Sequence, residues 1–158
     1  MVKAIESGIM FAESKVKGLS PPDMTIFCWR VLVGSFLIWG VWDNIVDTSR
    51  MAEFVAFLKA HGFPSPHVLA PLSVWAQFAC GMAFMLGFAT RWFGLLCAFN
   101  FVVALTMVDL SGGVRQAFPS AMLIVFGVHL AAAGAGRLAV DHWSSIGWLP
   151  LGRRYTAD

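Results

Sequence analysis

The sequence predicts an all-α integral membrane protein, an antiparallel four-helix transmembrane bundle with interfacial amphipathic helices. Two apolar runs, 68–89 and 92–108, are separated by only Thr90 and Arg91. A bilayer core of roughly 30 Å takes about 20 helical residues, so each run can span it as one arm of a helical hairpin. Charged residues make up 13% of the chain. Average soluble proteins carry about 25%, so the composition also indicates a membrane protein.

The chain divides into three parts. We expect an N-terminal amphipathic cytoplasmic segment (1–22), a four-span membrane domain (23–136) and a C-terminal interfacial or cytoplasmic tail (137–158). Charges recur through the first segment, which argues against a secretory signal, and its apolar residues follow the spacing of a helix on the membrane surface. The remaining length suits four spans with short connections and leaves no room for a separate soluble catalytic domain.

The first span is predicted from about residue 24 to residue 46, after a break made by two prolines. Asp23 is placed to cap it. Arg30 lies about two turns in, where a long side chain can reach back to the head groups. Trp39 and Trp42 have the character of interfacial aromatics, so both ends of the span are marked.

Residues 47–62 are too polar to span and predict an amphipathic helix along the interface. An apolar face at helical spacing is set apart from the charged side chains; the apolar face is Met51, Phe54, Val55 and Leu58, and the charged residues are Arg50, Glu53 and Lys59. Gly62 ends this helix, and the prolines that follow prevent its continuation.

Small residues recur four apart in the other three spans, which are expected to begin near residues 68, 92 and 116. The stripes are Ala79, Ala83 and Gly87; Gly94 and Ala98; and Gly127, Ala131 and Ala135. Such stripes let neighbouring helices approach closely in lipid, so they predict a tight bundle. Beyond residue 136, Asp141 is expected to cap a short interfacial helix that carries a tryptophan.

Basic residues are unequally divided between the two sides of the predicted bundle. One side would hold seven of them, Lys3, Lys15, Lys17, Arg91, Arg137, Arg153 and Arg154, and the other would hold Arg50, Lys59 and Arg115. The positive-inside rule then places both termini in the cytoplasm. The net charge of +2 is too small to indicate nucleic acid as a partner.

The three cysteines, Cys28, Cys80 and Cys97, all lie in apolar runs and lack C-x-x-C spacing. We expect them to be small core residues rather than disulfide partners or metal ligands. No other pattern typical of a metal site is present.

Several groups of residues follow one another in a distinctive order. They are Arg30, Gly34 and Gly40; Gly62-Phe63-Pro64-Ser65-Pro66; Gln77 with Gly81; the turn Leu86-Gly87-Phe88-Ala89-Thr90-Arg91; and Gly134-Ala135-Gly136-Arg137 followed by Asp141. Together they resemble the DoxX family of small four-span bacterial membrane proteins, over roughly residues 25–145. This resemblance implies the four-span fold and, less directly, a role beside quinone-linked enzymes. The family includes proteins named for the membrane subunit of thiosulfate:quinone oxidoreductase and for a small subunit of a terminal quinol oxidase.

This chain departs from the family pattern at one place. Relatives often carry a glutamate in the second span where this chain has Gln77. An amide cannot exchange a proton near neutral pH, so a proton relay that used this glutamate in relatives is not expected here.

Each span carries one polar group that is costly in lipid: Arg30, Gln77, Asn100 and His129. An arginine at the centre of a span costs roughly 2.5 to 3.5 kcal/mol on the insertion scale, so these groups should point inward and pair. We expect a pocket in the cytoplasmic half of the bundle that holds a quinone head group or a similar small amphiphile. The alternative is that Gln77 and Asn100 bond across helices as packing contacts while Arg30 reaches the head groups alone.

These features lead us to expect an inner-membrane subunit of a quinone-linked redox complex, surrounded by lipid and by other membrane protein subunits. The chain shows no convincing site for an intrinsic cofactor, so quinone is the one candidate ligand and a partner would carry the electron-transfer centres. Haem is disfavoured because only His129 lies inside a span, and a transporter is disfavoured because no two halves carry matching broken helices. The rival is a non-catalytic structural or assembly subunit; no catalytic residue can be named.

Overall fold

The structure is a computed structural model that describes residues 21–143, in which every regular element is a helix. In order these are α2 (Pro21–Val46), α3 (Thr48–Ala60), α4 (Pro66–Leu86), α5 (Thr90–Met107), the short 3-10 helix η1 (Asp109–Gly112), α6 (Val114–Ala133) and α7 (Val140–Trp143). Within this part of the chain, α2, α4, α5 and α6 are long and apolar enough to cross a membrane. The predicted all-α membrane bundle is confirmed. The predicted surface helix of segment 1–22 and most of the tail lie outside the described residues.

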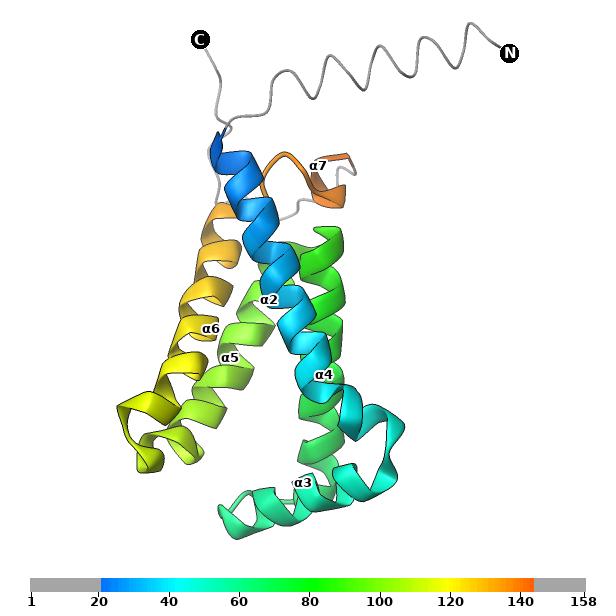
Figure 1. The fold of residues 1–158 in the computed structure, drawn as a ribbon, viewed down its shortest axis with the longest axis vertical. Coiled ribbons are helices and arrows are strands. Elements are labelled where there is room, and N and C mark those ends of the chain that lie inside the picture. Colours follow the sequence, from blue (N-terminus) through cyan, green and yellow to red (C-terminus); the bar gives the residue numbers. More distant parts are fainter. Residues whose placement is uncertain (1–20, 144–158) are drawn as a thin grey trace, which may run out of the picture.

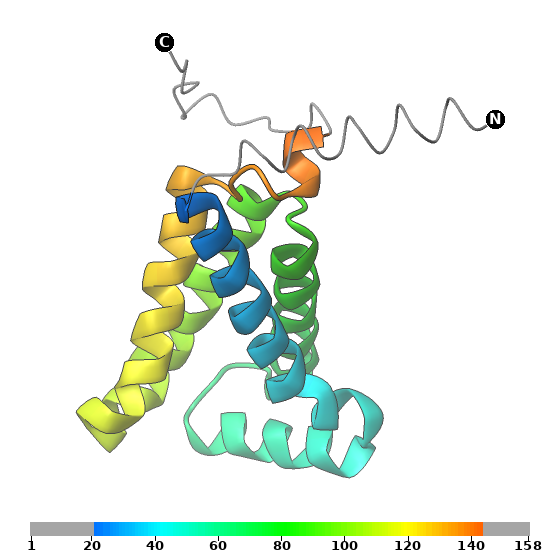
Figure 2. The same cartoon turned by 45° about the horizontal axis from the view of Figure 1, so that its top comes forward.

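The four long helices form two antiparallel pairs, α2 with α4 and α5 with α6 (Figure 1). The pairs are joined where the end of α4 turns into the start of α5. They lie close together at the end where α7 packs, and diverge toward the opposite end, where α3 crosses (Figures 1 and 2). We call these the α7 end and the α3 end of the bundle.

Each pair is held by one close crossing of two glycines. A methyl group on Gly34 of α2 would lie 2.7 Å from the carbonyl oxygen of Gly81 in α4. A methyl group on Gly94 of α5 would lie 2.5 Å from the carbonyl oxygen of Gly127 in α6. Helix backbones therefore touch directly, which maximises van der Waals contact where lipid provides no hydrophobic drive for association.

The predicted small-residue stripes of α5 and α6 are confirmed, and in α4 a glycine outside the predicted stripe makes a close contact. Gly127 faces the backbone and side chain of Ala98, and Gly94 faces the backbone of Ala131, so the stripes of α5 and α6 do pack on each other. In α4, Gly81 also approaches a neighbouring helix closely, although it lies between the residues of the predicted stripe. The stripe alone does not reveal which side of α4 meets a neighbour, because small residues occur on more than one side.

Helix α3 lies across the end of the α2–α4 pair, as the amphipathic pattern predicts (Figure 1). Leu58 is buried against the bundle, while the charged residues of the opposite face are exposed. The Asp47 carboxylate caps the start of α3 by accepting a hydrogen bond of 2.8 Å from the backbone N–H of Ser49. Gly62, at φ +77°, follows the end of the helix in a left-handed conformation that favours glycine.

The core lies where the pairs meet and contains Val33, Leu37, Cys80, Phe84, Cys97, Leu123 and Leu130. Phe84 of α4 packs edge to face on Phe126 of α6, with ring centroids 5.7 Å apart. The prediction of core cysteines is confirmed for Cys80 and Cys97 but is wrong for Cys28, which is exposed on the outer side of α2. The sides of an apolar helix look alike in sequence, so only the packing against other helices decides which side faces inward.

Candidate functional site

Arg30 is buried completely, with 0% of its surface exposed, in the α7 end of the bundle. Its Nε donates a hydrogen bond of 2.9 Å to the carbonyl oxygen of Phe84 near the end of α4. Its Nη1 donates to two carbonyl oxygens in the loop after α6, that of Ala135 at 2.5 Å and that of Leu138 at 3.0 Å. One guanidinium thus ties α2 to α4 and to the segment between α6 and α7.

The surroundings of Arg30 explain how a charge is tolerated there. The last carbonyls of a helix have no intrahelical partner and carry partial negative charge, so the end of α4 attracts a cation. The Asp141 carboxylate attracts the guanidinium through space, and the guanidinium carbon lies 5.8 Å from the centre of the Phe27 ring. Arg30 therefore neither reaches alone to the head groups nor points into a pocket with the other three predicted residues.

Asp141 caps the start of α5. Its Oδ1 accepts a hydrogen bond of 2.6 Å from the N–H of Ala89, and its Oδ2 accepts bonds of 2.9 Å from both the N–H and the hydroxyl of Thr90. In return, the N–H of Asp141 donates to the carbonyl oxygen of Gly87 at 2.9 Å. The prediction that Asp141 caps its own short helix is wrong, because the unpaired N–H groups of α5, distant in sequence, lie within reach of its carboxylate.

Gly87 makes this arrangement possible. It follows α4 at φ +71°, and a methyl group there would lie 2.6 Å from the Nη2 of Arg30 and 2.6 Å from the Cβ of Ala139. Only glycine combines the left-handed backbone with the space that the guanidinium fills. We call this assembly of Arg30, Gly87, Thr90 and Asp141 the Arg30 junction.

A second polar group joins α4 to α5 nearer the middle of the bundle. Gln77 Nε2 donates a hydrogen bond of 3.2 Å to the hydroxyl oxygen of Ser73, and this hydroxyl donates one of 3.0 Å to the Oδ1 of Asn100. All three side chains are half-buried. We call Ser73, Gln77 and Asn100 the amide cluster.

In the amide cluster, one acceptor atom and one donor atom make no hydrogen bond at all within the described residues. Among residues 21–143, no hydrogen bond reaches the Oε1 of Gln77 or leaves the Nδ2 of Asn100. Neither is a buried atom without a partner, so both are open to whatever surrounds the bundle. The cluster can therefore offer an amide N–H and an amide carbonyl to one small polar group.

His129 lies apart from both groups, on the exposed side of α6 beside the exposed Val125 and Val128. The buried side of α6 passes through Gly127 and Leu130. His129 is two residues, or about 200°, from Gly127 around the helix, so it faces outward. Its predicted inward orientation is wrong, because the glycine crossing fixes which side of α6 meets α5.

Of the four predicted residues, the structure thus brings together Gln77 and Asn100. The residue that links them, Ser73, is absent from the prediction. The sequence held one signal for it, since Ser73 lies four residues before Gln77 and residues at this spacing are neighbours on a helix. Arg30 and His129 lie elsewhere for the reasons given above.

The sequence comparisons give one match. A family model described as DoxX matches residues 25–110, which is more than half of the chain and contains Arg30, Gly87, Thr90 and the whole amide cluster. No curated protein and no solved structure matches the chain.

Proposed function

The chain belongs to the DoxX family of membrane proteins, and from this premise we propose that it is a subunit of a quinone-linked redox complex in the bacterial inner membrane. In this proposal the amide cluster holds the head group of a quinone or a similar small amphiphile. The α7 end faces the cytoplasm, and a partner protein carries the electron-transfer centres. The unequal division of lysine and arginine predicted from the sequence, which counts residues outside 21–143, supports this orientation.

The observation that carries the proposal is the unused donor and acceptor of the amide cluster. Hydrogen-bonding groups without partners are costly in an apolar layer, so a ligand that pairs both is favoured. A quinone carbonyl can accept a hydrogen bond from the Nδ2 of Asn100. After reduction, a quinol hydroxyl can donate one to the Oε1 of Gln77. The same two groups thus suit both forms of the ligand.

Gln77 limits what this chain contributes. An amide does not titrate in the physiological range, so the cluster orients a head group and does not itself take up or release protons. Electrons therefore reach the ligand from the partner's electron-transfer centres, and protons reach it from partner groups or from water. The role is that of a binding subunit within a larger complex.

The test is a titration of a short-chain ubiquinone analogue into the purified full chain in lipid nanodiscs. Asn100→Leu and Gln77→Leu keep the side-chain volume close. Asn100→Leu removes the bond to the quinone carbonyl and should weaken binding of the oxidised analogue by about tenfold, the factor for 1.4 kcal/mol. Gln77→Leu removes the bond from the quinol hydroxyl and should weaken binding of the same analogue in its reduced form to a similar extent. Ser35→Ala is the matched control. Its hydroxyl is exposed on α2 and lies 3.9 Å from the sulfur of Met85. Equal affinities for all four proteins would refute the site.

A second candidate function is that of a non-catalytic assembly subunit, and the Arg30 junction favours it. Four residues of the pattern that resembles the DoxX family meet there: Arg30, Gly87, Thr90 and Asp141. They contact one another or bond to the backbone of this chain. Such a junction stiffens a scaffold and leaves ligands nothing to bind. If the amide-cluster variants support full activity of the parent complex while Asp141→Ala prevents its assembly, this second function replaces the first.

A further inference from the structure

A groove of about 480 Å³ lies at the α3 end, where α2 leaves the bundle and α3 turns across it. From α2 it is lined by Gly40, Asp43 and Asn44. The α3 side contributes a charged pair, Arg50 and Glu53, and two phenylalanines, Phe54 and Phe57. The groove therefore has charged groups of both signs beside an aromatic wall.

The groove lies at the level of a membrane surface. It is formed by the last two turns of the span α2, and Trp39 and Trp42 on these turns are 82% and 48% exposed. Exposed tryptophans at the end of a span are typical of the head-group layer. A ligand in this groove would therefore meet lipid head groups before it met bulk water.

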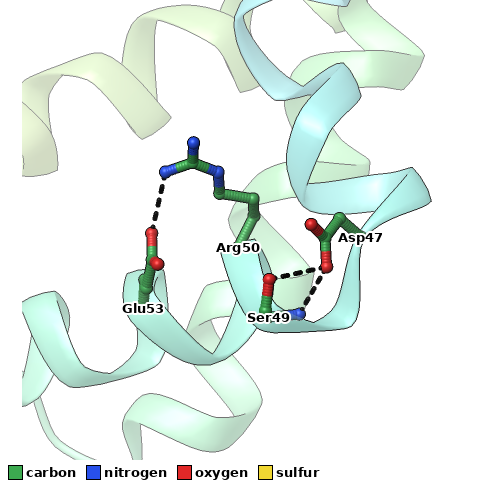
Figure 3. A network of polar contacts seen from close by, with 4 residues as sticks. All are labelled: Asp47, Ser49, Arg50 and Glu53. Carbon is green, nitrogen blue, oxygen red and sulfur yellow. Dashed lines mark hydrogen bonds and ion pairs between the residues drawn. The ribbon is translucent and has the colours of Figure 1, made fainter.

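The first turns of α3 determine which charged side chains face the groove. Asp47 does not line the groove. Its carboxylate accepts hydrogen bonds from the N–H of Ser49 at 2.8 Å and from the hydroxyl of Ser49 at 2.7 Å (Figure 3), and it attracts the guanidinium of Arg50 through space. The Nη1 of Arg50 lies 3.0 Å from the Oε2 of Glu53, and this pair is drawn apart from the Asp47 cap (Figure 3). The other guanidinium N–H groups of Arg50 have no partner among residues 21–143.

Asp43 of α2 adds a second carboxylate to the groove. No hydrogen bond or ion pair involves its carboxylate within the described chain, and the residue is exposed. The groove thus offers one free carboxylate and the free N–H groups of one guanidinium, held on two different helices. With Asp43, Glu53 and Arg50 ionised, its net charge is negative by one.

We propose that this groove binds the head group of a zwitterionic phospholipid that carries a primary ammonium. The free N–H groups of Arg50 donate to the phosphate, for which a guanidinium is well suited. The ammonium donates to the Asp43 carboxylate, and the glycerol and upper acyl carbons lie on Phe54 and Phe57. An anionic phospholipid fits less well, because it supplies no cation for Asp43 and brings a net negative charge to a groove that is already negative.

Gly40 provides a way to close the groove without disturbing the fold. A methyl group at Gly40 would meet no atom within 4 Å, although the residue lines the groove. A leucine there would project into the groove, and leucine is a better helix former than glycine. Gly40→Leu should therefore exclude the lipid while α2 stays folded.

The experiment is native mass spectrometry of the full chain, released from nanodiscs that contain equal amounts of phosphatidylethanolamine and phosphatidylglycerol. The wild type should retain about two to five times more phosphatidylethanolamine than phosphatidylglycerol, the ratio expected from one exposed ion pair. Asp43→Asn should abolish the preference, and Gly40→Leu should abolish the retained lipid. Lys59→Gln, also exposed on α3 but outside the groove, should behave as the wild type.

Two results would overturn the proposal. One is equal retention of the two lipids by the wild type, or a preference for phosphatidylglycerol. The other is lipid retention by Gly40→Leu at the wild-type level and with the wild-type preference. Circular dichroism of each variant confirms that loss of lipid does not come from loss of helix.

Discussion

The Arg30 junction and the amide cluster both place polar side chains inside the apolar bundle. They differ in how far the hydrogen bonds of those side chains are used within the chain. In the junction, the guanidinium bonds to carbonyl oxygens of Phe84, Ala135 and Leu138 and is attracted by Asp141. In the amide cluster, Gln77 and Asn100 bond through Ser73 and each keeps a free group. The difference indicates that the junction serves the fold, whereas the cluster can serve a ligand.

The largest expected effect is that of Arg30→Met on stability. The substitution leaves three carbonyl oxygens without their donor. A buried unsatisfied group costs about 1–3 kcal/mol, so the free energy of unfolding should fall by several kcal/mol. Denaturation of the detergent-solubilised protein measures this. Arg50→Met is the control, because its exposed ion pair contributes about 0–1 kcal/mol; similar unfolding of both variants would show that the junction is not structural.

A smaller effect is expected from filling the glycine crossing that brings α2 against α4. In Gly34→Ala the new methyl group would lie 2.7 Å from the carbonyl oxygen of Gly81, so the helices must separate. We expect the free energy of unfolding to fall by about 1–3 kcal/mol, as it does at other overpacked sites. Gly40→Ala, on the same helix but beside open space, should be neutral or slightly stabilising. A melting temperature that falls equally in both would argue against close contact at Gly34.

Asp141→Ala should have a more local consequence. It removes the carboxylate that accepts from the N–H groups of Ala89 and Thr90 at the start of α5. Loss of a helix cap costs about 0.5–2 kcal/mol. Hydrogen exchange should therefore accelerate at residues 89 and 90 and change little at Asn100. Unchanged exchange at residues 89 and 90 would show that Asp141 does not cap α5.

The smallest effect is expected from pH, at the exposed cap of α3. The hydrogen bonds from the hydroxyl and then the N–H of Ser49 hold the pKa of Asp47 below its ordinary value. A lowered pKa means that the cap is fully effective above the ordinary carboxyl value of about 4 and is lost as the pH falls through the lower folded-state pKa. A spin label on Ala52 should report an unchanged α3 from pH 8 to pH 5 and a loosening only in stronger acid. Asp47→Asn should remove this acid dependence, and loosening near pH 6 would contradict it.

Much of the fold follows from the sequence, because span length and apolar content are local properties. The four spans and the amphipathic α3 are confirmed, with boundaries that shift by a few residues. The α5–α6 stripes are confirmed too, since Gly94 and Gly127 each lie directly against the backbone of the other helix.

The site was harder to predict, because it depends on how each helix is rotated about its axis. In an apolar span, no charged side marks which face meets lipid, so His129 could not be placed from its position alone. Arg30 and Asp141 form the junction with groups 51 to 108 residues away, and such contacts leave no periodic signal. Ser73 is not predicted as a site residue, because a serine in a span can satisfy its hydroxyl with a nearby backbone carbonyl.

The most direct test of the central claim is photoaffinity labelling with an azidoquinone in native membranes, followed by peptide mapping of the labelled sites. If the amide cluster holds the head group, label that excess ubiquinone competes away should fall on α4 and α5 near Gln77 and Asn100, and Asn100→Leu should lose it. Competed label around Arg30 and Gly87, or label at Asn100 that ubiquinone does not displace, would contradict the account.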